Sequence, residues 1–237
     1  MNFSQKIYIL ALLVFSLQKT VAQNAIVFEE SNYETIIQKS KIAKKPVFYM
    51  IYATWCPHCN KMKKEVFTDK KVIDFFNSNF INAQQDGDSE HGKYLKEKFN
   101  VSSLPTFVFL DENGTILYKL KGEYSPEQLI SEAKNALNPS MQLPYLEKQF
   151  SSDISDGNKC MAYLIALRKG NDRKTIAIPA HKYLNTQQES QLATNLNWMV
   201  IANGVTDIES REFQYVLNHK KDFETIVGTD QVQRKVL

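Results

Sequence analysis

Residues 46–59 read PVFYMIYATWCPHC and place the strongest strand signal of the chain beside its clearest chemical motif. The first eight of these residues are apolar and rich in aromatic side chains, which predicts a buried strand. After the second cysteine, Met62 and Val66 stand four residues apart, and this spacing predicts an amphipathic helix over 58–68. The two cysteines therefore lie where a strand passes into a helix.

Cys56 and Cys59 are separated by two residues, so both fit on the first turn of the predicted helix and can form or exchange a disulfide. The N-terminus of a helix offers unpaired N–H groups and a partial positive charge. This field stabilises a thiolate over a thiol, so we expect the pKa of Cys56 to be low and its sulfur to be nucleophilic near neutral pH. The pair predicts a redox site.

Zinc binding and a purely structural cross-link are the two alternatives for this pair. A structural zinc site needs four ligands, usually from two cysteine pairs. Cys160 is the only further cysteine, and the remaining histidines, His91, His181 and His219, are scattered along the chain. We therefore expect neither a metal nor another cofactor. A disulfide across a two-residue loop removes little chain entropy, so a purely structural role is also disfavoured.

The N-terminus predicts a secretory signal peptide over residues 1–23. Lys6 supplies a basic start, residues 7–17 form an uncharged apolar core, and small residues precede Gln23. As a helix this core would rise about 16 Å, roughly half of a bilayer core, so a cleaved signal is favoured over an uncleaved anchor. We expect a periplasmic or otherwise exported protein that is not stably inserted in a membrane after cleavage.

Composition limits the remaining possibilities. The chain is 43% hydrophobic and 23% charged, as in an ordinary globular protein, and its net charge of +3 is too small to indicate a nucleic-acid partner. Three cysteines are too few for a disulfide scaffold. About 215 residues remain after the predicted signal, which suits two modest domains.

The first predicted domain covers residues 24–138. Ser31 and Glu34 form a capping-box pattern that opens its first helix. Ser125 caps its last helix, with Pro126 at the first helical position and Gln128 as the capping glutamine. The predicted elements are a helix ending at 42, a strand over 46–53, a helix over 58–68, a strand over 79–85, a helix starting at 89, a hairpin of strands over 106–110 and 115–120, and a helix ending at 137.

This order of elements resembles the thioredoxin superfamily over about residues 30–137. The resemblance is carried by Trp55-Cys-x-x-Cys59 after a buried strand and by Leu104-Pro105-Thr106 before the hairpin strand. It implies an α/β thioredoxin-like fold, a central mixed sheet flanked by helices. It further implies that Cys56 attacks and Cys59 resolves, that Trp55 shields the site, and that a cis Pro105 faces the disulfide. The backbone at Leu104 would then pair with an extended substrate segment.

Two features point to different relatives within this superfamily. Residues 65–69 with Val72, Phe75 and Phe76 look like the helix after the active site in exported thioredoxin-like reductases, such as the C-terminal domain of DsbD. The dipeptide Pro57-His58 instead resembles the oxidase DsbA, where it accompanies a strongly oxidising disulfide. We expect both residues to tune the pKa of Cys56, His58 by pairing with its thiolate. The alternative is an exposed His58 without a partner.

Met50 is a departure from the thioredoxin pattern. Thioredoxins usually carry a buried aspartate six residues before the first cysteine, and this aspartate is thought to accept the proton of the resolving thiol. Methionine at this position leaves the proton of Cys59 to water or to an unidentified base. Glu65 is near in sequence, but we expect it to lie on a solvated helix face.

Strand signals nearly vanish in residues 139–237, and apolar residues take helical spacing. Predicted helices cover 141–150, 158–169, 172–185, 188–203 and 208–224. This α-helical region would present substrates or partners to the redox domain, or would simply cap it. Cys160 lies in an apolar helical run and is predicted to be a free buried thiol, with a role in mixed disulfides as the alternative.

The sequence therefore predicts an exported thiol–disulfide oxidoreductase that acts on protein disulfides or dithiols and exchanges electrons with an upstream redox partner. The overall layout favours a reductase or isomerase over a dedicated oxidase. The alternative is a non-catalytic interaction protein, in which the first domain is a scaffold and the helical region binds the partner.

Overall fold

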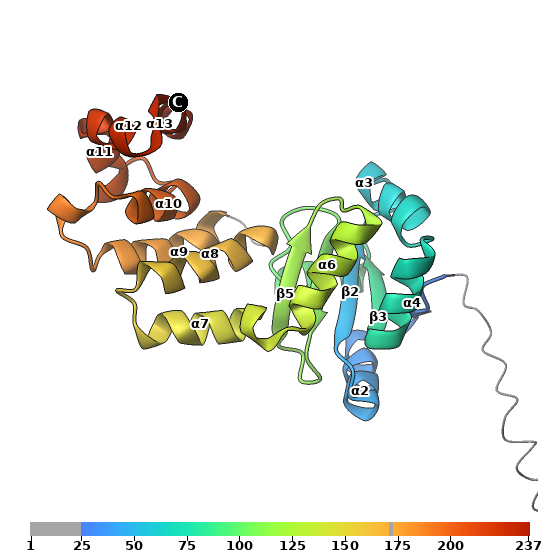
Figure 1. Cartoon of the computed structure of the whole chain (residues 1–237). Coiled ribbons are helices and arrows are strands. Elements are labelled where there is room, and N and C mark those ends of the chain that lie inside the picture. Colours follow the sequence, from blue (N-terminus) through green and yellow to red (C-terminus); the bar gives the residue numbers. More distant parts are fainter. Residues whose placement is uncertain (1–24, 171–172) are drawn as a thin grey trace, which may run out of the picture.

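The structure is a computed structural model that describes residues 25–170 and 173–237, and Figure 1 shows an α/β part followed by a helical part. The predicted signal peptide, residues 1–23, lies outside the described residues. Within the described ranges, no helix combines the length and the apolar character needed to cross a bilayer.

Five strands form one mixed sheet in the order β1-β3-β2-β4-β5. Their bounds are β1 Phe28–Glu29, β2 Val47–Tyr52, β3 Ile81–Asp86, β4 Thr106–Leu110 and β5 Ile116–Lys121. β1 and β2 flank β3 in parallel, whereas β4 runs antiparallel to both β2 and β5. The central strand, the hairpin and the mixed sheet are as predicted. The short edge strand β1 was not predicted, because two residues carry no periodic signal.

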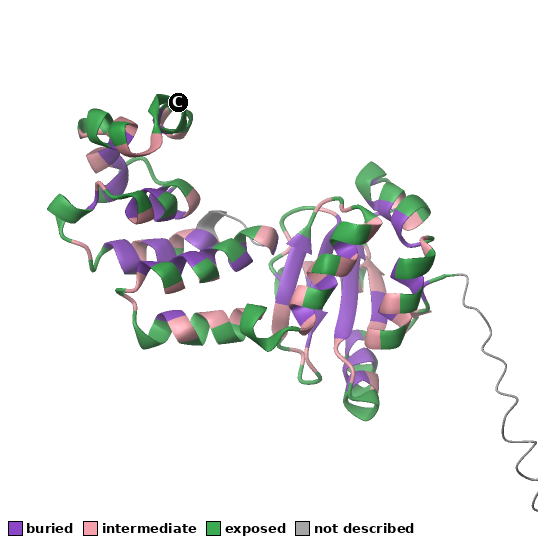
Figure 2. Ribbon diagram, viewed as in Figure 1, coloured by how far each residue is buried: buried purple, intermediate pink, exposed green. Residues whose placement is uncertain are grey.

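Alternation along β2 gives the sheet two apolar faces. Figure 2 shows the central strands in purple, the colour of buried residues. Phe48 and Met50 point to the face covered by α3 Pro57–Lys61, α4 Lys70–Asn79 and α6 Pro126–Leu137. On the opposite face, Val47, Tyr49 and Ile51 pack against α2 Tyr33–Ala43 and α5 Glu90–Lys98. Val47 to Ile51 of the central strand are therefore buried and Tyr52 is half-buried, which fits the continuous apolar sequence of the strand.

Helix caps agree with the predictions at α5 and α6 and differ at α2. Ser125 and Gln128 form the predicted reciprocal capping box, and Ser89 caps α5. The cap of α2 is Asn32, whose side chain accepts the N–H of Thr35, so the predicted Ser31 cap is wrong by one residue. Serine and asparagine both suit an N-cap. With Asn32 as the cap, the helix begins at Tyr33, which is buried.

The predicted helix over 58–68 is interrupted. α3 ends at Lys61 and passes into a π-helical turn, Met62–Val66, after which Asp69 caps the separate helix α4. The Asp69 carboxylate accepts the N–H groups of Lys71 and Val72 at 2.8 and 3.2 Å. Because of this break, α4 lies along the sheet, whereas α3 lies at one end of the sheet.

Residues beyond Pro139 are helical, as predicted, and the described helices are α7 Leu143–Ser152, α8 Gly157–Gly170, α9 Arg173–Leu184, α10 Asn195–Gly204, α11 Arg211–Asn218, α12 Lys220–Val227 and α13 Thr229–Val236. The predicted helix over 208–224 is in fact two helices that meet at His219, and α13 was not predicted. These helices enclose an apolar cluster of their own, which includes Trp198 and Phe223.

The helical region packs on the edge strand β5 through α7 and α8. Lys169 of α8 donates to Tyr118 Oη at 2.7 Å and to the carboxylate of Glu132. Lys119, the next residue of β5, is buried, and its ammonium donates to the carbonyls of Phe99 and Asn100, just after α5. The hydrogen bonds of Lys169 thus join the two parts, whereas each part has apolar clusters of its own.

We propose a domain boundary at Pro139 and expect a chain of residues 24–138 to fold cooperatively. The strands, both cysteines and two apolar clusters lie within this range. Loss of the Lys169 hydrogen bonds should lower the free energy of unfolding by about 1–3 kcal/mol. Thermal unfolding and reduction of a small disulfide substrate would test this, with full-length Lys169→Met as the matched control. Aggregation or non-cooperative melting of the truncated chain would contradict the boundary.

Candidate active site

Cys56 and Cys59 form a disulfide at the start of α3, with their Cα atoms 5.3 Å apart. Cys56 is the N-cap residue, and its Sγ accepts the backbone N–H of Cys59 at 3.2 Å. Pro57 occupies the first helical position, where its lack of an N–H costs nothing. Cys56 is 3% exposed and Cys59 is fully buried. Cys56 is thus the more exposed residue of the pair, and the start of α3 directs a backbone N–H at its sulfur.

Trp55 lies beside the disulfide and is 68% exposed. Its indole Nε1 donates to the Asp88 carboxylate at 2.6 Å, in the loop between β3 and α5. The turn beneath it is held by Asn60, whose amide donates to the carbonyl of Thr54. A hydrogen bond thus holds the indole while most of its surface stays exposed. No local pattern signals Asp88, because it lies 33 residues from Trp55 in the sequence.

The Leu104-Pro105 peptide bond is cis, as the resemblance implied. Pro105 is buried, and Leu104 is partly buried against the apolar cluster that contains both cysteines. The carbonyl of Pro105 accepts the N–H of Gly122 at 2.9 Å, which ties this segment to the loop after β5. The structure therefore brings Leu104 to the same cluster as the cysteines, 45 residues from Cys59 in the sequence.

Met50 is fully buried in the cluster that contains both cysteines. Its neighbours in the sheet register are Gln84 on β3 and Phe107 on β4, so both flanking strands place uncharged residues opposite it. Glu65 is exposed on the π-helical turn, as expected. Neither residue provides a buried carboxylate for the proton of Cys59.

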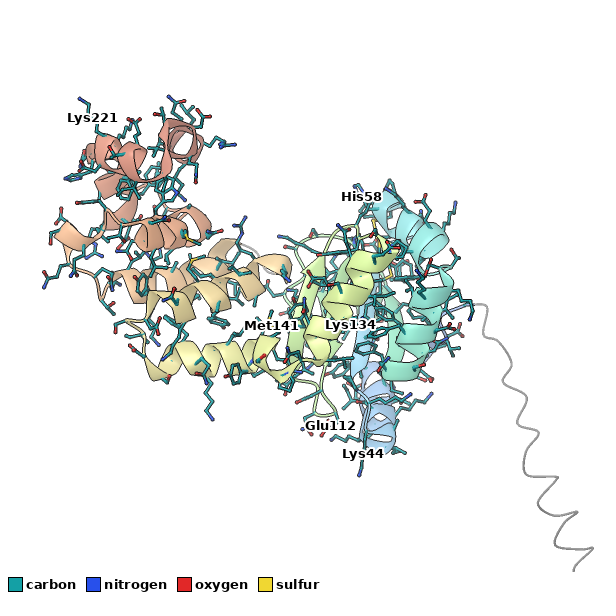
Figure 3. All side chains as sticks on the ribbon, in the orientation of Figure 1. Lys44, His58, Glu112, Lys134, Met141 and Lys221 are labelled. Carbon is teal, nitrogen blue, oxygen red and sulfur yellow. A yellow bond between two sulfur atoms is a disulfide. The ribbon has the colours of Figure 1, made fainter. Side chains whose placement is uncertain are left out.

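His58 has a partner that the sequence did not reveal. Its side chain is 65% exposed, and its Nδ1 pairs with the carboxylate of Glu123 in the loop between β5 and α6. Lys61 Nζ lies 2.7 Å from the other oxygen of the same carboxylate. Figure 3 shows His58 at the end of the domain that carries the yellow disulfide. No local pattern signals Glu123, because it reaches α3 only through the fold, from 65 residues away.

Charge around Glu123 explains its protonation state. Hydrogen bonds from Lys61 and from His58 lower the pKa of the Glu123 carboxyl below its usual value. The carboxylate therefore stays ionised at neutral pH. The predicted pairing of His58 with the Cys56 thiolate concerns the reduced state, and in this oxidised structure the imidazole is paired with Glu123 instead.

Cys160 is free and fully buried within the helical region, which agrees with the predicted free buried thiol. Its Sγ lies 3.7 Å from the carbonyl oxygen of Pro179, and burial raises the pKa of this thiol to about 12. The thiolate needed for exchange is therefore scarce. Across the described ranges, no three side chains of histidine, cysteine, aspartate or glutamate converge on a point that could hold a metal ion.

Comparison with known proteins agrees with this geometry. The family model of the thioredoxin-like domain matches residues 33–137. This part of the chain is a thioredoxin-like domain. Protein disulfide-isomerase 1 of Dictyostelium discoideum is 27% identical over 133 residues, which make up 56% of this chain and 34% of that protein. The thiol:disulfide interchange protein DsbD of Yersinia pestis is 41% identical over 73 residues, 30% of this chain and 12% of DsbD.

Two solved structures are similar to the thioredoxin-like domain. A thioredoxin from Thermus thermophilus gives a TM-score of 0.43 at 20% identity and covers 48% of this chain and 88% of its own. The oxidised C-terminal domain of DsbD from Neisseria meningitidis gives 0.39 at 17% identity and covers 44% and 90%. The chain thus spans about a third or less of the two curated relatives and most of each of these single-domain structures. The predicted resemblance of residues 30–137 to the thioredoxin superfamily and the likeness to DsbD are confirmed.

Proposed function

We propose that the chain is an exported thiol–disulfide oxidoreductase that exchanges disulfides with protein substrates through Cys56 and Cys59. The observation that carries the proposal is the position of the disulfide at the start of α3, with Cys56 Sγ accepting a backbone N–H. The two relatives are named as a disulfide-isomerase and a thiol:disulfide interchange protein, which supports the same class of reaction for this chain.

The reaction needs two sulfur exchanges and transfers two electrons. In the reduced domain, the Cys56 thiolate attacks one sulfur of a substrate disulfide, and the second substrate sulfur leaves as a thiolate. Cys59 then loses its proton and attacks Cys56 Sγ in the mixed disulfide, which releases the remaining substrate sulfur and leaves the Cys56–Cys59 disulfide. Electrons from an upstream redox partner would restore the dithiol, and the reverse sequence would oxidise a substrate.

The other site residues would act on binding and on charge. An extended substrate segment would lie along Leu104 and Pro105, beside the exposed face of Trp55. Pro57 and His58 would set the stability of the Cys56 thiolate. A reductase or isomerase direction is proposed from the sequence resemblance to exported reductases, and the likeness to a protein named disulfide-isomerase supports the isomerase side of it. Export is supported by the signal-like sequence of residues 1–23.

The helical region would add a partner surface. Its exposed apolar side chains include Ile165, Ile178 and Met199 on three successive helices. The competing function is a non-catalytic interaction protein, in which the helical region binds the partner and the thioredoxin-like domain is only a scaffold.

Reduction of insulin by dithiothreitol separates the two functions. We expect the full mature chain to accelerate precipitation of the insulin B chain, because each cycle of Cys56 and Cys59 cleaves one interchain disulfide. A chain with both cysteines replaced by serine is the matched control and should give only the uncatalysed rate. Equal rates for the two chains would contradict the enzymatic proposal and favour the scaffold.

A further inference from the structure

We propose that Glu123 is a positioning residue that sets the redox poise of the cysteine pair by neutralising the cationic side chains beside Cys56. This proposal rests on the proposed exchange role of Cys56. It concerns a residue outside the Cys-Pro-His-Cys motif, which approaches that motif only through the loop between β5 and α6.

The position of Glu123 is fixed from both sides. On one side, Gly122 has a φ of 92° and donates its N–H to the carbonyl of the cis Pro105. On the other side, the N–H of Tyr124 donates to Met62 Sδ at 3.4 Å, on the π-helical turn after α3. A positive φ is readily adopted only by glycine among common residues, so Gly122 suits this turn. The loop thereby holds the carboxylate over the first turns of α3.

The carboxylate is shared between two side chains of that helix. His58 and Lys61 each pair with one oxygen, and the Glu123 side chain is only 29% exposed. Glu65 acts on Lys61 from further along the helix and adds a second, weaker negative charge. The His58 and Lys61 side chains are 65% and 54% exposed, so salt screens these pairs in part and they are strongest at low ionic strength. The carboxylate offsets positive charge that His58 and Lys61 place on α3, the helix that begins at the disulfide.

Compensation changes the stability of the Cys56 thiolate. With a neutral imidazole, Lys61 and Glu123 sum to zero charge, and loss of the carboxylate would leave one net positive charge. With a protonated imidazole, the three side chains sum to +1. Loss of the carboxylate would then raise the net charge, or leave it unchanged if the imidazole also released its proton. Removal of Glu123 thus makes the surroundings of Cys56 equally or more positive, and it frees the imidazole to turn toward the sulfur.

A more positive environment stabilises the thiolate, and hence the reduced dithiol relative to the disulfide. Glu123 consequently makes the pair more reducing than its Pro57-His58 dipeptide would on its own. This resolves the conflict between an oxidase-like dipeptide and a reductase-like domain. His58 in the motif and Glu123 in the loop between β5 and α6 then set the reduction potential of the cysteine pair together.

The test is the equilibrium of the mature chain with reduced and oxidised glutathione. For Glu123→Gln we expect the equilibrium to move about threefold to tenfold toward the dithiol, where tenfold corresponds to about 30 mV for this two-electron couple. Glu112→Gln removes the same charge from the β4–β5 turn, which Figure 3 shows near the end of the domain opposite His58. This control should leave the equilibrium unchanged, and thermal melting should confirm that both variants fold.

A second background tests how much of the effect of Glu123 requires His58. In a His58→Gln chain, the additional Glu123→Gln substitution should still move the equilibrium toward the dithiol, because it leaves Lys61 without its carboxylate, and only the part of the shift that needs a freed imidazole should be lost. An unchanged equilibrium for Glu123→Gln, a shift toward the disulfide, an equal shift for Glu112→Gln, or no shift at all in the His58→Gln chain would each overturn the proposal. The glutathione equilibrium can be measured even if insulin is not reduced, so failure of the proposed function gives a separate result.

Discussion

Replacement of Cys56 by serine is expected to reduce disulfide exchange to the uncatalysed rate. Cys56 is the slightly exposed member of the pair and the one whose sulfur accepts a helix N–H. Replacement of Cys59 by serine should have a different result, because Cys56 can still attack but nothing resolves the adduct. The Cys59→Ser chain should therefore accumulate mixed disulfides, which non-reducing electrophoresis and intact-mass measurement would detect.

Cys160→Ala provides the control for these two variants. Cys160 is fully buried and burial raises its pKa to about 12, so its removal should leave exchange unchanged. Equal trapping of substrate by Cys56→Ser and Cys59→Ser would contradict the assignment of attacking and resolving sulfurs. Trapping that disappears only with Cys160→Ala would instead place the reactive thiol in the helical region.

Local signals in the sequence predicted much of the thioredoxin-like domain. The continuous apolar run at β2 predicts a strand buried on both faces, and β2 is indeed covered by helices on both sides. Ser125 and Gln128 form a capping box whose two hydrogen bonds connect residues three apart. Such features depend on neighbours in the sequence, so they can be inferred before the fold is known.

The errors arise where several local solutions compete. Ser31 and Asn32 are both good N-caps, and only the packing of Tyr33 selects Asn32. The apolar pattern of residues 58–79 continues across a break that a π-helical turn and the Asp69 cap introduce. Asp69 carried a usable signal, since aspartate is among the preferred N-cap residues.

The site was predicted only as far as its motif extends. Short patterns, and the resemblance that they carry, made Cys56, Cys59, Trp55 and Pro105 candidate site residues before the fold was known. Glu123 and Asp88 contact the motif across 65 and 33 residues, and no spacing rule connects them to it. Residues that tune a site through charge can come from any loop that the fold brings near, so their identification requires the tertiary structure.

Replacement of Met50 by aspartate is expected to destabilise the domain strongly above neutral pH. Met50 is fully buried among apolar side chains, where desolvation would raise the pKa of a carboxyl. A rise of about three units above the unfolded value of about 3.9 would cost about 4 kcal/mol of unfolding free energy. Because the pKa is raised in the folded state, this loss is absent below pH 3.9, grows as the pH rises, and is complete above the folded pKa.

Met50→Asn is the matched control, since asparagine has nearly the same shape as aspartate and does not titrate. Urea denaturation at pH 4 and pH 8 should give a pH-dependent difference between Met50→Asp and Met50→Asn, and Met50→Leu should cost less than about 1.5 kcal/mol at either pH. The resemblance to thioredoxins also implies that the new carboxylate accepts the proton of Cys59, so Met50→Asp should resolve mixed disulfides faster than Met50→Asn. Equal stability of these two variants at pH 8 would show that a charge at position 50 is solvated. In that event water could reach Cys59 from the same side, and methionine at this position would not restrict the proton transfer that completes exchange.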